Sequence, residues 1–85
     1  MIVRKPTPGE IKTANSWDTW SKEPSEFPWS YDTRETCYIF EGEAMVTGKD
    51  GKTIRFGPGD WVEFEEGLEC TWKINKAIRK KYMFG

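Results

Sequence analysis

The chain has 85 residues, which is enough for one domain with a single small core and little stability to spare. Its formal charge of −1 argues against nucleic acid or an anionic membrane as a partner, because both require a clustered positive excess. No segment approaches the roughly 20 apolar residues of a membrane span, and no signal peptide follows Met1. We therefore expect a single cytoplasmic domain (1–85) in which Cys37 and Cys70 are reduced thiols.

The first 16 residues predict an N-terminal arm made of a strand and a short helix. Thr7 and Glu10 have the spacing of a capping box, and Pro8 stands at the first helical position between them. The helix should end near Asn15.

From residue 17 to residue 84 the pattern changes to that of short β-strands. Aromatic residues first alternate with polar ones, which favours strands over helix. Three glycine turns then separate the remaining strands, at Asp50-Gly51, Pro58-Gly59 and Glu66-Gly67. Many short antiparallel strands with tight turns predict a sandwich or a barrel.

One of these strands is apolar on both faces. Cys37 and Ile39 lie on one face, and Tyr38 and Phe40 lie on the other. Such a strand cannot have one side in water, so we expect it to be covered by the N-terminal arm together with Trp17 and Trp20, or by a second subunit.

Two motifs frame the predicted barrel. Glu35 precedes Gly42 by seven positions within ETCYIFEG, and Gly59-Asp60 is followed by Gly67 and then by Cys70. In both motifs the pattern resembles the cupin superfamily, also called RmlC-like, and in particular the small single-domain cupins grouped with ureidoglycine aminohydrolase and the ethanolamine-utilisation Q-type proteins. The resemblance implies an all-β fold, a small antiparallel jelly-roll (double-stranded β-helix) barrel.

The departures from the family pattern bear on function. Metal-binding cupins carry two histidines shortly before the glutamate and a third in the second motif. Here Trp29 and Tyr31 stand at the first two positions, or Pro28 and Ser30 with the longer spacing, and Cys70 stands at the third. The chain contains no histidine at all. We therefore expect no metal and no other cofactor.

The resemblance places the binding site inside the barrel, where Glu35 and Cys70 should approach each other. Strand parity adds Cys37, and it adds Lys80, which shares a face with Tyr82. We predict an ion pair between Glu35 and Lys80. The side chains expected to complete the pocket are all aromatic: Trp29, Tyr31, Trp72 and Tyr82.

Each of these polar side chains also has a purely structural interpretation. Glu35 could be a buried carboxylate satisfied by its neighbours, and Cys37 and Cys70 are more often small core residues than nucleophiles. Glu35 and the two thiols have the donor types for zinc, but they lack a clear fourth ligand.

Three functions follow from these residues. The leading one is a metal-independent cupin that binds a small molecule of undefined identity. An alternative, resting on family analogy alone, is an enzyme of the ureidoglycine aminohydrolase type, with Glu35 as general base and Lys80 or Tyr31 as its acidic partner. The third is a structural module with a filled barrel. We expect a homodimer, because the strand with Tyr38 and Phe40 is apolar on both faces and the pattern predicts that Trp17 and Trp20 are exposed. The resemblance to small cupins also implies a dimer.

Overall fold

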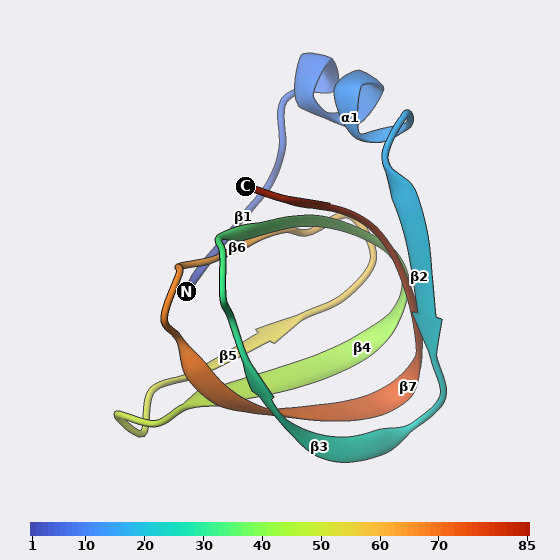
Figure 1. Ribbon diagram of the computed structural model, residues 1–85. Coiled ribbons are helices and arrows are strands. Elements are labelled where there is room, and N and C mark those ends of the chain that lie inside the picture. The colour runs from blue at the N-terminus through green and yellow to red at the C-terminus, as the bar shows by residue number, and fades with distance from the viewer.

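The computed structural model describes residues 1–85 and contains seven antiparallel strands and one helix. In chain order these are β1 (Ile2–Arg4), α1 (Pro8–Ala14), β2 (Asp18–Lys22), β3 (Ser25–Ser30), β4 (Glu35–Gly48), β5 (Thr53–Phe56), β6 (Trp61–Phe64) and β7 (Glu69–Phe84). The strands form one sheet that curls into a barrel, and α1 lies outside the ring of strands (Figure 1). The predicted all-β barrel with a short N-terminal helix is confirmed.

The helix begins and ends where the sequence predicts. The Thr7 hydroxyl accepts a hydrogen bond from the Glu10 amide at 3.2 Å, and the Thr7 amide donates to the Glu10 carboxylate at 2.9 Å. These two bonds form the complete capping box and satisfy amides that the first helical turn leaves free. The chain has no helix that is long and apolar enough to span a bilayer.

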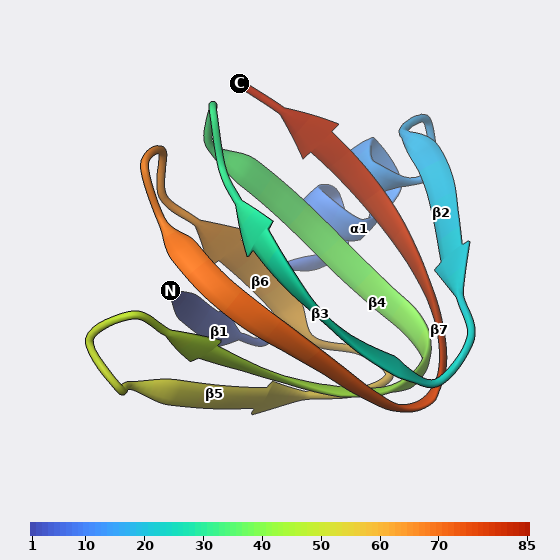
Figure 2. The same ribbon diagram turned by 60° about the horizontal axis from the view of Figure 1, so that its bottom comes forward.

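Strands β4 and β7 form the spine of the barrel. They pair with each other along almost their whole length, β4 also pairs with β5 and β6, and β7 also pairs with β2 and β3. With 14 and 16 residues they are much longer than the short strands that the sequence predicts. Figure 2 shows that both strands bend at the same end of the barrel. Each strand therefore pairs with different neighbours before and after its bend.

The bend is built on irregular pairing around Gly42. The register between β4 and β7 shifts between Ile39 and Ala44, which is how a β-bulge turns a strand without ending it. Gly42 has a φ of +91°, a conformation that favours glycine. The strand therefore continues through Gly42 as a bulge and does not end there.

The outer face of β4 is covered by the N-terminal arm. Tyr38 pairs with Trp61 of β6, and the Trp17 ring lies 5.4 Å from the Trp61 ring. The Arg4 guanidinium lies over the same Trp61 ring at 5.4 Å. The arm is thus one of the two covers predicted for this strand. Trp17 and Trp20 are both partly buried, so the expectation that they are exposed is wrong, while the homodimer stays a prediction.

The packing at Gly42 gives a sharp test of the fold. A Cβ at this position would lie 2.2 Å from the Ala77 carbonyl oxygen, whereas a Cβ at Gly67, which also has a positive φ, would meet nothing within 4 Å. We expect Gly42→Ala to lower the free energy of unfolding by more than about 2 kcal/mol and Gly67→Ala by about 1 kcal/mol. Urea unfolding of the two variants measures the difference, and equal losses would contradict the close approach at Gly42.

Candidate functional site

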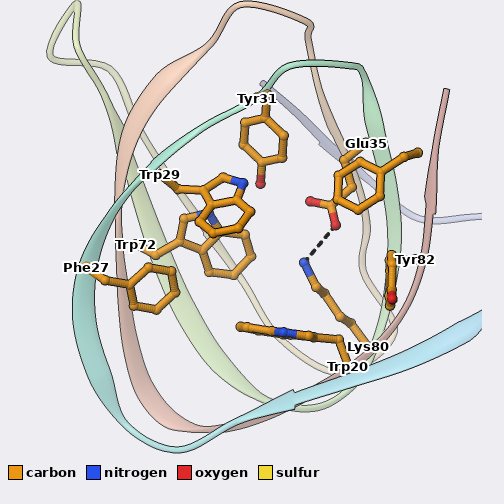
Figure 3. Close-up of a pocket in the computed structure, with 9 residues that line it drawn as sticks. Trp20, Phe27, Trp29, Tyr31, Glu35, Trp72, Lys80 and Tyr82 are labelled. Atoms are coloured by element: carbon orange, nitrogen blue, oxygen red, sulfur yellow. Dashed lines mark hydrogen bonds and ion pairs between the residues drawn. The ribbon is translucent and has the colours of Figure 1, made fainter.

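The barrel contains a cavity of about 180 Å³. Two of its nine lining residues are charged and the other seven are aromatic, and they come from β2, β3, β4, β7 and the segment after β3 (Figure 3). The lining residues are Trp20, Phe27, Trp29, Tyr31, Glu35, Trp72, Lys80, Tyr82 and Phe84. The barrel is therefore not completely filled by its own side chains.

The two charged residues form the predicted ion pair. Lys80 Nζ donates a hydrogen bond to Glu35 Oε2 at 3.0 Å, and the residues are only 5% and 3% exposed. In the pairing of β4 with β7, Lys80 lies opposite Ile39, four residues along the strand from Glu35. Both side chains point inward, so they meet inside the barrel rather than across one strand pair.

Two tryptophans flank the ammonium group of Lys80. Nζ lies 4.8 Å from the centroid of the Trp20 ring and 4.7 Å from that of Trp72. Attraction between a cation and an aromatic face strengthens when water is excluded, so these rings offset part of the cost of burying the charge. Trp20 is brought here because β2 pairs with β7 and places it directly opposite Lys80.

Tyr31 supplies a hydroxyl group to the same site. Its ring stacks on Phe64 with centroids 4.9 Å apart, and its hydroxyl points towards the Glu35 carboxylate (Figure 3). Burial, and after it the negative charge of Glu35, raises the pKa of Tyr31 far above its ordinary value. The phenol therefore stays neutral and can donate a hydrogen bond throughout the physiological pH range.

The two thiols do not line the cavity, which corrects their predicted place in the pocket. Cys37 faces inward but is fully enclosed, opposite Val62 on one side and Tyr82 on the other. The Cys70 thiol donates to the Trp29 carbonyl oxygen at 3.5 Å.

Burial also disfavours the thiolate form of both cysteines. It raises the pKa of Cys37, and the nearby Lys80 ammonium offsets only part of this shift. It raises the pKa of Cys70 to about 11, and the Glu35 charge adds to the effect. Since the thiolate is the nucleophile and the metal ligand, neither cysteine is prepared for such a role at neutral pH.

The side chains around Glu35 do not fit a metal ion. No three His, Cys, Asp or Glu side chains come close enough together to hold one. The zinc site considered for Glu35, Cys37 and Cys70 is therefore not assembled. The partner of Glu35 is instead the Lys80 ammonium group, which is itself a cation.

The fold and the two sequence motifs identify the family. Residues 10–82 match the model of the EutQ-like cupin domain. The chain therefore belongs to the EutQ-like cupin family. This confirms the resemblance to small cupins of the ethanolamine-utilisation Q type.

Solved structures of other cupins share this fold. A DUF861 family protein from Thermotoga maritima is 46% identical over 99% of this chain and 98% of its own, with a TM-score of 0.95. The EutQ protein of Clostridium difficile (17% identity, TM-score 0.71) and a DUF861 protein of unknown function from Pseudomonas syringae (24%, 0.72) match 78% and 79% of this chain. This EutQ-like cupin spans only 52% and 29% of those two chains, so they show the fold alone. No curated protein matches the chain.

Three cavity residues of this EutQ-like cupin were not predicted from its sequence: Trp20, Phe27 and Phe84. Phe84 shares the inward face of β7 with Lys80 and Tyr82, and this parity is visible in the sequence. Phe27 and Trp20 reach the cavity because β3 and β2 pair with β7, and no local pattern reveals that pairing.

The ion pair predicts a large effect of removing one partner. Lys80→Met leaves the Glu35 carboxylate buried without a counter-charge, so we expect the free energy of unfolding to fall by about 3–5 kcal/mol. Replacing both residues, as Lys80→Met with Glu35→Gln, should restore most of the loss. Exposed Lys73→Met is the control and should change stability by less than about 0.5 kcal/mol. Chemical unfolding measures all three, and a double variant no more stable than Lys80→Met would contradict the pairing.

The raised thiol pKa values predict slow alkylation of the native protein. At pH 8 only about one Cys70 side chain in a thousand is ionised, and fewer at Cys37, so iodoacetamide should modify neither. Both should react within minutes in guanidinium chloride, as counted by mass spectrometry. Rapid modification of the folded protein would show that a thiol is accessible and activated.

Proposed function

We propose that this EutQ-like cupin is a metal-independent protein that binds a small molecule in the cavity described above. One observation carries the proposal: the cavity has aromatic walls and ends on a polar centre whose two charges already neutralise each other. Binding sites for small molecules have this composition, with apolar walls and few polar groups that orient the ligand.

Metal independence is supported by the partner of Glu35. The carboxylate that resembles the family's glutamate ligand has its charge balanced by Lys80 from within the chain. A cation from solution would have to displace the ammonium and then find further ligands among aromatic side chains.

Access to the cavity is supported by the residues at its rim. Trp29 and Phe84 are 47% and 51% exposed, although both line the cavity. A cavity of about 150 Å³ can hold benzene, so this one suits a ligand built on a single ring.

Binding is favoured over the two alternatives by the same geometry. An enzyme of the aminohydrolase type would need a free base, yet Lys80 holds Glu35 and both thiols are protonated. A filled structural barrel would leave no cavity.

We expect added ligands, but not added metals, to stabilise the protein. A fragment at a hundred times its dissociation constant should raise stability by about 2.7 kcal/mol, which is a rise in Tm of several degrees for a domain of this size. Zinc, manganese or iron should leave Tm unchanged, and so should EDTA. Nuclear magnetic resonance titration should place the shifts at the cavity residues. Stoichiometric metal in elemental analysis of the purified protein, or a fragment screen without any hit in the cavity, would contradict the proposal.

A further inference from the structure

We infer that the cavity selects a neutral, flat ring that carries an N–H group next to a C=O group, as in a cyclic amide (lactam). The inference rests on the proposed function, since it names the class of small molecule that the cavity would bind. It follows from three properties of the cavity: its charge, the polar atoms it presents and its shape.

The charge of the site excludes charged ligands. Glu35 and Lys80 are the only charged lining residues, and they are paired at 3.0 Å. Tyr31 adds no charge, because its phenol stays protonated. An anion would lie against the Glu35 carboxylate and a cation against the Lys80 ammonium, and either would enter an aromatic-walled site without a free counter-charge. Burying an uncompensated charge is costly, so a neutral molecule is favoured.

The polar atoms of the site form an adjacent acceptor and donor. Lys80 occupies Oε2 of Glu35. Oε1 accepts no hydrogen bond and is not fully enclosed, since every fully enclosed polar side-chain atom has a partner, and Glu35 lines the cavity. Oε1 can therefore accept a hydrogen bond from a ligand. The Tyr31 hydroxyl points towards the same carboxylate and can donate one (Figure 3). A ligand that satisfies both carries an N–H and a C=O side by side.

The shape of the site favours a flat ring. Trp72 and Phe27 are stacked on each other, with ring centroids 6.2 Å apart and 7° between the ring planes, and Trp20 and Trp29 add further aromatic surface to the cavity. Flat faces pack best against flat ligands. A volume of about 180 Å³ admits one ring with small substituents, or about ten non-hydrogen atoms at most.

The test compares small ring compounds by nuclear magnetic resonance titration of the wild-type protein at neutral pH. The probe is 2-pyridone, which has the adjacent N–H and C=O, and N-methyl-2-pyridone is its matched partner with the donor blocked. Benzoate and benzylamine carry a negative and a positive charge, and toluene has neither charge nor hydrogen-bonding groups. We expect 2-pyridone to bind in the cavity at least about tenfold more tightly than each of the other four, because each leaves a polar group unpaired or a charge unbalanced.

A pair of tyrosine variants tests the donor. Tyr31→Phe removes only the hydroxyl and keeps the ring that stacks on Phe64, so it should weaken 2-pyridone about threefold to tenfold and leave toluene unchanged. Tyr38→Phe removes the same group from the outer face of β4, away from the cavity, and should change neither. The ligand comparison on the wild-type protein stands alone if Tyr31→Phe does not fold.

The outcomes separate this inference from the proposed function. Tighter binding of benzoate or benzylamine, or equal binding of toluene or N-methyl-2-pyridone, would overturn the lactam preference and leave small-molecule binding in place. If none of the five compounds binds in the cavity but a wider screen finds a ligand there, only the inference fails. If nothing binds there, both fail.

Discussion

The rest of the site depends on the ion pair between Glu35 and Lys80, buried at 3.0 Å inside a barrel of only 85 residues. Removing two charges from water costs more than their attraction usually returns, so an apolar pair of similar volume would serve stability as well or better. The surrounding tryptophans lower that cost and also line a cavity. A costly pair placed at the end of an aromatic cavity is more readily explained by ligand binding than by stability.

The fold makes this arrangement possible through its two long strands. β4 contributes Glu35 and β7 contributes Lys80, and the strands pair along almost their full length. The bulge at Gly42 bends both of them, so that inward-facing side chains converge instead of lying in parallel rows. The remaining strands add the aromatic walls by pairing with the same two strands.

The sequence predicts the local features of this protein well. The helix cap, the glycine turns and the inward face that holds Lys80 and Tyr82 all depend on neighbouring residues. The pairing of Lys80 with Glu35 is predicted by strand parity together with the family resemblance, which places Glu35 inside the barrel. The position of Trp20 depends instead on which strand lies beside β7, which is set by the whole fold. The depth of Cys37 and Cys70 was misjudged for a related reason: parity gives the face on which a residue lies but not how far its side chain reaches.

The chain has no histidine at the positions that resemble the metal ligands of other cupins, and this absence changes what the site offers to a ligand. A divalent metal beside a carboxylate leaves net positive charge and attracts oxygen anions. The Lys80 ammonium neutralises the Glu35 carboxylate, so the pair carries no net charge. The ammonium also lies close to the rings of Trp20 and Trp72. In the proposed function, recognition would fall to the remaining carboxylate oxygen, the Tyr31 hydroxyl and the aromatic walls of the cavity. Under the proposed function, a small cupin scaffold in which the Lys80 ammonium balances the Glu35 carboxylate would take neutral ligands in place of a metal ion.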